Sequence, residues 1–195
     1  QAIYRKFRPR VFDDVLGQEH ITTILKNQIL SDNIAHAYLF SGTRGTGKTS
    51  TARIFARAIN CIDICEGNPC NKCSICKGIL EESIMDIVEI DAASNNSVED
   101  IRELRENSKY PPSNCKYKVY IIDEVHMLSK GAFNALLKIL EEPPKHLIFI
   151  LATTEPQRLP ATIISRCQRY DFKRVMVDDI VKNMEKICNE VGISV

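Results

Sequence analysis

The segment SGTRGTGKTS at positions 41–50 is the feature that most constrains how this chain folds. It fits the pattern G-x-x-x-x-G-K-[ST] through Gly42, Gly47, Lys48 and Thr49, and it stands between an apolar run and a helical pattern. Glycines in such a turn let backbone N–H groups point at a phosphate, and the helix amino terminus adds positive potential. The sequence therefore predicts a phosphate-binding loop, although a glycine-rich turn with an exposed lysine is the simpler alternative.

The lysine of such a loop and the residue after it have defined roles. Lys48 is expected to contact the β and γ phosphates of a nucleotide, and the Thr49 hydroxyl is expected to bind Mg²⁺. The other expected nucleotide contacts come from the same loop: Gly42, Thr43, Gly45, Thr46, Gly47 and Ser50. The sequence contains no Asn-Lys-x-Asp element that reads guanine, which disfavours a GTP switch.

Short apolar runs rich in β-branched residues alternate with helical patterns along the chain, which predicts a parallel sheet covered by helices on both faces. Strands are expected at 36–42, 86–91, 118–124, 146–154 and 167–172. Helices are expected at 18–30, 48–59, 97–107, 131–142 and 177–193. The expected class is thus α/β, a parallel five-stranded P-loop sheet flanked by helices.

Asp123 and Glu124 end the apolar run KVYIIDE. The carboxyl edge of a parallel sheet would bring them beside the phosphate loop. Asp123 could then hold hydrated Mg²⁺, and Glu124 could orient or deprotonate an attacking water. Taken alone, two acids at a strand end are as readily solvated turn residues, so the phosphate loop is what favours catalysis.

Net charge and hydropathy exclude fewer functions than the motifs do. The 26 Lys and Arg residues nearly balance the 25 Asp and Glu residues, so contact with nucleic acid or an anionic membrane must come from a local patch. The amino-terminal segment is charged from its fifth residue, and no apolar run is long enough to span a bilayer. We therefore expect a cytoplasmic protein with no membrane contact. Gln1 and Val195 as terminal residues suggest a piece of a longer protein.

Five cysteines gather between the phosphate-loop helix and the next strand: Cys61, Cys65, Cys70, Cys73 and Cys76. Two overlapping C-x-x-C pairs with an upstream cysteine suit the four soft ligands of a structural Zn²⁺, in a small insertion. An iron–sulfur cluster is the alternative, but Leu80 stands where the next cysteine of a ferredoxin motif is expected. A disulfide framework is disfavoured in a chain that otherwise looks cytosolic.

These features together resemble the AAA+ ATPases, and more closely the gamma/tau family of motor subunits of the bacterial DNA polymerase III clamp loader. The segments that carry the resemblance are YRKFRPRVFDDVLGQEH, GTRGTGKT, INCIDICEGNPCNKCSICKGI, EIDAASNNSVEDIREL, VYIIDEVHMLSKGAFNALLKILEEPP, ILATTEP and SRCQRYDF. They cover nearly the whole chain and are specific in combination.

The resemblance implies further site residues. Val15, Leu16 and Gly17 would be neighbours of the adenine of ATP, although this amino-terminal segment could equally pack on the core. Thr154 would be a sensor whose hydroxyl reaches the γ-phosphate or the lytic water, with a strand-capping threonine as the alternative. Arg166 would be an arginine finger that acts in trans on a neighbouring subunit's nucleotide, with a solvated surface arginine as the alternative.

For the cysteines, the family pattern C-x8-C-x2-C-x2-C selects Cys61, Cys70, Cys73 and Cys76 as zinc ligands. It leaves Cys65 as a bystander or a possible substitute. The scattered Cys115, Cys167 and Cys188 are expected to be packing residues: they fall outside the cluster.

The implied function is an ATP-binding and ATP-hydrolysing motor that opens a sliding clamp and loads it on primer–template DNA, with other clamp-loader subunits in a hetero-oligomeric ring. The implied cofactors are ATP, Mg²⁺ and Zn²⁺. Residues 1–176 would form the AAA+ domain, with a zinc module at about 61–78, and residues 177–195 would begin a truncated helical lid. A lid arginine would fall beyond Val195, so only weak turnover is expected of the isolated chain.

DNA contact is likewise implied only by the resemblance. Related helices face DNA at the places of Arg102, Arg105, Lys109 and Lys130, where phosphate contacts would not read bases. A solvated helix face explains each of them more simply. Two other functions stay open, a nucleotide-binding scaffold without hydrolysis and an AAA+ helicase or remodeller.

Overall fold

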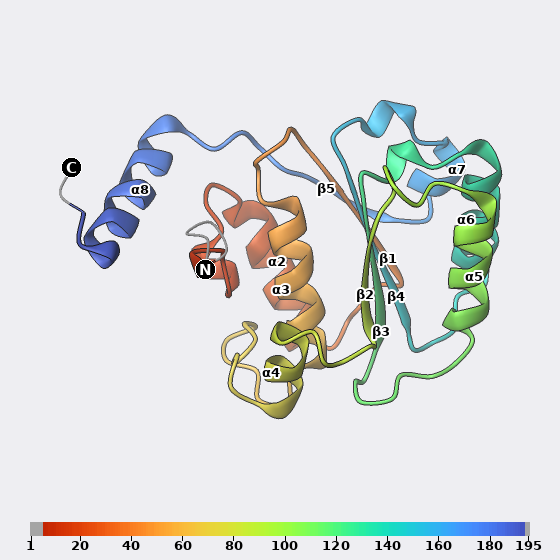
Figure 1. Ribbon diagram of the computed structural model, residues 1–195, viewed down its shortest axis with the longest axis horizontal. Helices are drawn as coiled ribbons and strands as arrows, with labels where there is room; N and C mark the ends of the chain where they lie inside the picture. The colour runs from red at the N-terminus through yellow and green to blue at the C-terminus, as the bar shows by residue number, and fades with distance from the viewer. Residues whose placement is uncertain (1–5, 194–195) are drawn as a thin grey trace.

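A five-stranded parallel sheet forms the centre of the protein in the computed structural model, which describes residues 6–193 (Figure 1). Its order is β2-β3-β4-β1-β5, and all four neighbouring pairs are parallel. The strand bounds are β1 Ala37–Ser41, β2 Ile87–Asp91, β3 Lys118–Asp123, β4 Leu147–Thr153 and β5 Gln168–Asp171. The five expected strands and the α/β class are confirmed.

The burial of the strands explains why the sequence predicted them well. Every residue of β1 and β4 is buried, and so are the four central residues of β3. Strands covered on both faces are continuous apolar runs instead of alternating patterns. The edge strands β2 and β5 are more exposed.

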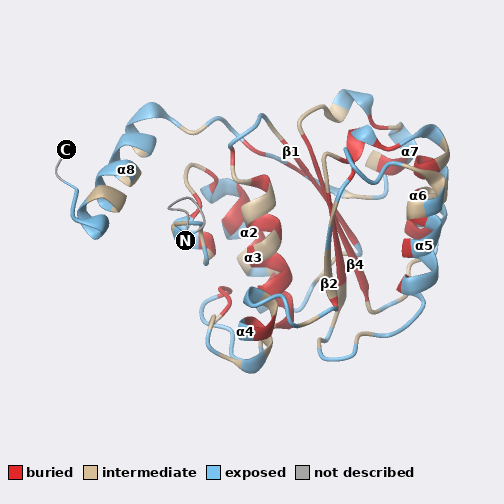
Figure 2. Ribbon diagram, in the orientation of Figure 1, coloured by how far each residue is buried: buried red, intermediate tan, exposed pale blue. Residues whose placement is uncertain are grey.

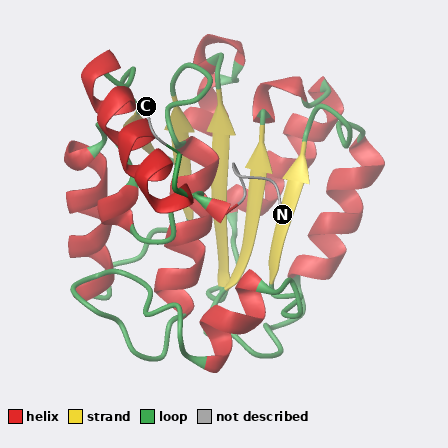
Figure 3. Cartoon of the chain, turned by 60° about the vertical axis from the view of Figure 1, so that its left-hand side comes forward, coloured by secondary structure: helices red, strands yellow, loops and turns green. Residues whose placement is uncertain are grey.

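Helices cover both faces of the sheet (Figures 1 and 3). One face carries α2 (Glu19–Leu30), α3 (Lys48–Asn60) and the short α4 (Ser74–Leu80). The other carries α5 (Val98–Ser108), α6 (Lys130–Glu141) and α7 (Ala161–Ile164). Three short 3₁₀ helices complete the layers: η1 Phe12–Asp14, η2 Val125–Met127 and η3 Pro156–Arg158.

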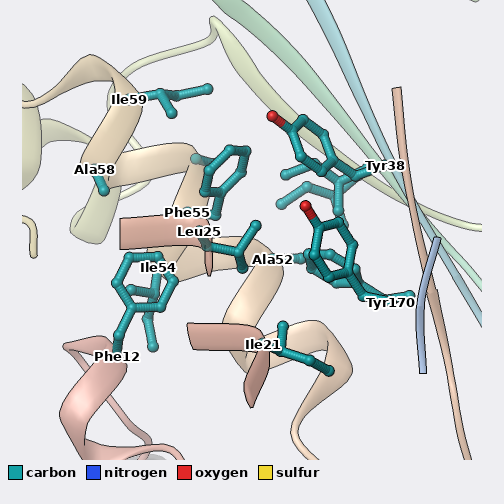
Figure 4. Close-up of a cluster of buried hydrophobic side chains, with 14 of the residues drawn as sticks. Phe12, Ile21, Leu25, Tyr38, Ala52, Ile54, Phe55, Ala58, Ile59 and Tyr170 are labelled. Atoms are coloured by element: carbon teal, nitrogen blue, oxygen red, sulfur yellow. The ribbon is translucent and has the colours of Figure 1, made fainter. Parts of the chain in front are cut away.

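Buried aromatic side chains hold the first helical layer to the sheet (Figure 4). Tyr38 of β1 meets Phe55 of α3 edge-on, with ring centroids 4.8 Å apart. Edge-to-face rings are favoured because the positive edge of one ring meets the negative face of the other. Phe12 lies in the same cluster, so the amino-terminal segment packs on α3 and α2.

Short polar residues cap the amino-terminal ends of α5 and α6 in the second helical layer. Ser97 accepts from Asp100 N, and the Asp100 carboxylate accepts from Ser97 N in return, which forms a capping box at the start of α5. Ser129 caps α6 by accepting from Ala132 N. The prolines at 143 and 144 then follow the end of α6.

The last helix, α8 (Val177–Val191), extends away from the sheet and its helices (Figures 1 and 2). None of its residues is buried, and its apolar side chains Val177, Ile180, Val181 and Met184 are exposed. The expected helix is present, close to its predicted bounds. In residues 6–193 no helix combines the length and apolarity needed to cross a membrane.

Candidate functional site

The phosphate loop runs from the carboxyl end of β1 into α3, as the sequence predicted. Gly47, with φ of 92°, is the residue before the first turn of α3, a left-handed conformation that glycine adopts without strain. A Cβ on Gly42 would come within 2.8 Å of the Phe172 carbonyl oxygen. The two glycines of the motif are therefore required by backbone geometry, as expected for a phosphate-binding loop.

Lys48 is the first residue of α3 and is only 6% exposed. Its Nζ donates to the carbonyl oxygens of Gly42 at 2.7 Å and Thr43 at 2.8 Å, which holds the ammonium group inside the loop. Burial lowers the pKa of Lys48, and the carboxylates of Glu124 and Asp123 partly oppose that effect. A buried cation beneath a turn of backbone N–H groups and the amino end of a helix fits an anionic ligand.

Thr49 and Asp123 meet across the site. The Thr49 hydroxyl donates to Asp123 Oδ2 at 2.9 Å, and the other carboxylate oxygen accepts from Glu124 N. A hydroxyl and a carboxylate, placed beside the loop, are the oxygen ligands that Mg²⁺ prefers. The two residues expected to bind Mg²⁺ are thus brought together, and the donor set fits the ion.

Glu124 follows Asp123 in a left-handed conformation, with φ of 51°. That region is sparsely populated by residues other than glycine, and the Glu124 side chain reaches the end of β4. Glu124 Oε2 accepts from the Thr154 hydroxyl at 3.0 Å. β4 lies between β1 and β3 in the sheet, so Thr154 stands where a sensor is expected.

A pocket of about 340 Å³ at the carboxyl edge of the sheet is lined by Lys48, Thr49, Asp123 and Glu124, and Thr154 reaches this lining through its hydrogen bond to Glu124. Two residues that the sequence analysis missed, Arg44 and Asp91, also line it. Asp91 ends β2 and is in register with Asp123 of β3, so the acid at the end of DIVEID was the signal for it. Arg44 stands at a variable position of the loop motif, which gave no signal.

The segment expected near the adenine packs beside the phosphate loop. Val15 is buried, and its Cγ1 would touch a Cβ added to Gly47 at 3.3 Å. Leu16 and Gly17 are half-buried. Gln18, which no pattern pointed to, donates to the carbonyl oxygens of Thr46 and Lys173 and accepts from Lys173 N. Contact of these residues with a base stays a prediction.

Arg166 lies outside this pocket, after α7. Its guanidinium donates to Glu141 Oε1 at 3.0 Å and to the carbonyl oxygen of Thr162 at 2.8 Å. A role on another chain's nucleotide stays a prediction. The expected DNA-contact residues are exposed on α5, just after it and on α6, and two of them form ion pairs one turn apart, Arg102 with Glu99 and Lys109 with Glu106.

Four cysteines gather at the far end of α3. The sulfur atoms of Cys61, Cys70, Cys73 and Cys76 all lie within 4.8 Å of one another. Tetrahedral zinc with Zn–S bonds of about 2.3 Å separates its sulfur ligands by about 3.8 Å, so the group fits the ion. Cys65 is exposed and lies outside the group. The structure therefore gathers the four cysteines that the family pattern selects.

Backbone N–H groups around the cluster favour thiolates. Cys73 N donates to the sulfur of Cys70, and Cys76 N donates to that of Cys73. Burial opposes ionisation of Cys73, but N–H groups of Cys76 and Ile62 outweigh it and lower the pKa of Cys73 to about 6. Burial raises the pKa of Cys61 and Cys76, so these two thiols would release their protons to solvent when a cation binds.

Comparison with known proteins places this geometry in a family. The family described as DNA polymerase III, delta subunit, matches residues 17–176. The chain belongs to this family. DNA polymerase III subunit tau of Bacillus subtilis (strain 168) is 62% identical over 195 residues, which are 100% of this chain and 35% of that protein. Subunit tau of Escherichia coli (strain K12) is 52% identical over 194 residues, 100% of this chain and 30% of that protein.

The expected resemblance to gamma/tau proteins is thus confirmed, and the chain spans about a third of the length of these curated relatives. A DNA polymerase III gamma subunit-related protein from Thermotoga maritima aligns with a TM-score of 0.62 at 24% identity, covering 87% of this chain and 52% of its own. The Thermotoga maritima RuvB Holliday junction branch migration motor aligns with a TM-score of 0.68 at 19% identity, covering 96% and 56%. At these identities the likeness shows the fold alone.

Proposed function

We propose that this chain is the ATP-binding and ATP-hydrolysing part of a motor subunit of the DNA polymerase III clamp loader. The observation that carries the proposal is the convergence of Lys48, Thr49, Asp123, Glu124 and Thr154 at one edge of the sheet, in a chain with tau relatives of 52–62% identity. In this proposal ATP turnover opens a sliding clamp and loads it on primed DNA.

Each residue has a role set by its chemistry. Lys48 and the N–H groups of the loop neutralise phosphate charge, and Thr49 and Asp123 hold Mg²⁺, which supplies further charge neutralisation when bound. Glu124 orients or deprotonates the attacking water, and the Thr154 hydroxyl holds the Glu124 carboxylate.

The amino-terminal segment and the loop hold the rest of the nucleotide. Val15, Leu16 and Gly17 neighbour the base, because Val15 packs against the phosphate loop. Most of the loop residues assigned to the nucleotide also line the pocket: Gly45, Gly47, Lys48, Thr49 and Ser50.

The four clustered cysteines hold a structural zinc ion, because an all-cysteine shell leaves no position for water. The AAA+ domain spans residues 1–176, with the zinc module at about 61–78, and residues 177–195 begin the lid. Of these spans, residues 1–5 and 194–195 lie outside the described residues. The exposed apolar side chains of α8 support a further domain packed against it.

The partners are companion subunits in a ring, the sliding clamp and primer–template DNA, and clamp loading takes place in the cytoplasm. Arg166 acts on a neighbour's nucleotide in this ring, because it stands outside the pocket of its own chain. A scaffold that binds ATP without hydrolysis is the alternative, and it has no need of the Asp123–Glu124 pair. A helicase or remodeller shares the fold, but the cysteine module has no evident use there.

The test is ATP turnover by the full-length protein, alone and with companion subunits, sliding clamp and primed DNA. We expect the complete set to stimulate turnover, and Arg166→Ala to reduce it by on the order of a thousandfold, since a finger stabilises charge that develops in the transition state. ATP affinity should stay unchanged in Arg166→Ala.

Lys116→Ala is the control, because Lys116 is exposed, lies outside the pocket and also forms an ion pair within its own chain, with Asp32. Turnover without stimulation by clamp and DNA argues for the helicase alternative. No turnover in any mixture argues for the scaffold alternative. Normal turnover by Arg166→Ala excludes the arginine-finger role of Arg166.

A further inference from the structure

His126 is a buried imidazole beside the candidate site to which neither the motifs nor the proposed function gives a role. It belongs to η2, directly after Glu124 and Val125, and it is 6% exposed. Two backbone hydrogen bonds hold this turn, Met127 N to Glu124 O at 2.9 Å and Leu128 N to Val125 O at 3.2 Å. The turn begins at the left-handed residue Glu124, and the side chains of Glu124 and His126 both contact threonines at the end of β4.

Polar groups from β4 and the turn after it contact both ring nitrogens. His126 Nδ1 lies 2.9 Å from Thr153 Oγ1 and 3.4 Å from Glu124 Oε2. On the opposite side of the ring, Nε2 lies 3.2 Å from Glu155 Oε2, which also accepts from Arg158 at 2.9 Å. The ring thus stands between two carboxylates, one that faces the pocket and one that faces the surface.

The shorter contact at each ring nitrogen, with Thr153 at Nδ1 and with Glu155 at Nε2, selects one tautomer. An ionised carboxylate only accepts hydrogen bonds, so Glu155 requires the hydrogen on Nε2. Nδ1 then presents a lone pair, which the Thr153 hydroxyl satisfies as donor, while Thr153 Oγ1 accepts from Glu155 N at 3.0 Å. With Nδ1 as an acceptor, the ring offers no hydrogen to Glu124 Oε2. The donor to Glu124 Oε2 is instead the Thr154 hydroxyl, at 3.0 Å.

We propose that His126 is a positioning residue for Glu124: the ring, fixed by Thr153 and Glu155, closes the inner side of the Glu124 carboxylate and keeps it turned toward Thr154 and the pocket. The proposal rests on the proposed function, because Glu124 is the group that orients water. Without the ring, the carboxylate has room to swing away from the pocket, and a misplacement of about 1 Å costs on the order of a hundredfold in rate.

A purely structural role for His126 is distinguishable. A histidine that only fills space would affect stability, and it would leave the turnover rate of the folded protein unchanged. A positioning residue instead lowers kcat and leaves the affinity for ATP unchanged, because the phosphate contacts of Lys48 lie elsewhere in the site.

Two substitutions separate the two sides of the ring. The amide of His126→Asn reaches the position of Nδ1, beside Thr153 and Glu124, and the longer amide of His126→Gln reaches that of Nε2, beside Glu155. We expect His126→Gln to lose about tenfold to a hundredfold in kcat, and His126→Asn to recover most of that loss. His146→Gln is the control, since His146 is half-buried and its Nε2 forms a hydrogen bond with the Ser108 carbonyl oxygen, away from the pocket.

Glu155→Gln is a second variant that leaves the buried ring in place, because the Glu155 side chain is 43% exposed. A glutamine amide can donate as well as accept, so it no longer fixes the hydrogen on Nε2, and a smaller loss in kcat is expected. Activity is measured with the full-length protein in the assembly proposed above, and the thermal stability of every variant is recorded.

A spectroscopic readout is independent of turnover. In full-length protein labelled with ¹⁵N-histidine, the ring resonances of His126, assigned by their absence in His126→Asn, should show hydrogen on Nε2, and Glu155→Gln should shift them. Hydrogen on Nδ1 overturns the inference, and so does a folded His126→Gln protein with normal kcat. A wild-type assembly without ATP turnover contradicts the proposed function instead, and the nitrogen resonances still decide where the ring is fixed.

Discussion

Single acidic residues of this chain differ in role because their neighbours differ. Glu124 has a left-handed backbone conformation, lines the pocket and accepts a hydrogen bond from Thr154. Asp86 directly precedes β2 and is 4% exposed. Its carboxylate accepts hydrogen bonds from three consecutive backbone N–H groups, those of Ser113, Asn114 and Cys115, at 2.7–2.9 Å. Asp86 therefore fastens the loop between α5 and β3.

This anchor makes a prediction about pH. Burial alone would raise the pKa of Asp86, but the three N–H groups outweigh it and hold that pKa below its usual value. A lowered pKa in the folded state gives stability above the ordinary value of about 3.9, and that stability is lost as pH falls through the folded value. Asp86→Asn should lower the free energy of unfolding at pH 7 by about 1–3 kcal/mol.

The measurement is urea unfolding of wild type and Asp86→Asn from pH 7 to pH 3, with the exposed Asp178→Asn as control. The difference between wild type and Asp86→Asn should shrink as the pH falls below the ordinary pKa of an aspartate. A difference that is constant over this range would mean that the charge of Asp86 does not hold the loop.

At the scale of elements, α3 connects the two chemical sites of the chain. It begins at Lys48 in the phosphate loop and ends at Asn60, just before Cys61. Its 13 residues span about 20 Å, so the cysteine cluster lies too far from the phosphate loop to contribute to chemistry there (Figure 1). The cluster instead fastens α4 and the amino-terminal segment, since Asn68 of the module accepts from Phe12 N.

Zinc removal tests this assignment. Cys73→Ser should reduce bound zinc from about one ion per chain to a small fraction of that and lower the unfolding temperature, because a structural site needs all four ligands. Cys65→Ser is the matched control, and it should keep both zinc and stability, because Cys65 is exposed outside the cluster. Metal analysis after reducing purification decides the point, and iron in place of zinc, or equal zinc in both variants, refutes it.

Sequence patterns predicted an element well where its own residues determine its structure. The phosphate loop and the strand that ends in Asp123 are local, so spacing revealed them. The short helix α4 lies among the cysteines, and its position depends on their contacts instead of on apolar periodicity. Gln18 and His126 gave no signal, because hydrogen bonds to residues distant in sequence hold them: Gln18 donates to the Lys173 carbonyl oxygen across 155 positions, and His126 bonds Thr153 across 27.

At the scale of the whole molecule, the parallel sheet unites these distant groups. β4 lies between β1 and β3, so the carboxyl ends of these three strands bring the phosphate loop, the two acids and Thr154 to one edge of the sheet. That meeting was predictable, because parallel strands end on one side of a sheet. The position of α8 was not, since it extends from the body with its apolar side chains exposed (Figure 2).

The central claim is that this edge binds ATP, and the most direct measurement is the affinity of the full-length protein for ATP with Mg²⁺, by calorimetry, for wild type and Lys48→Ala. We expect Lys48→Ala to weaken binding by at least about tenfold, because the phosphates lose a charged hydrogen bond. Lys138→Ala is the control and should bind normally, since Lys138 is exposed on α6. Equal affinity in wild type and Lys48→Ala, both folded, would contradict the account.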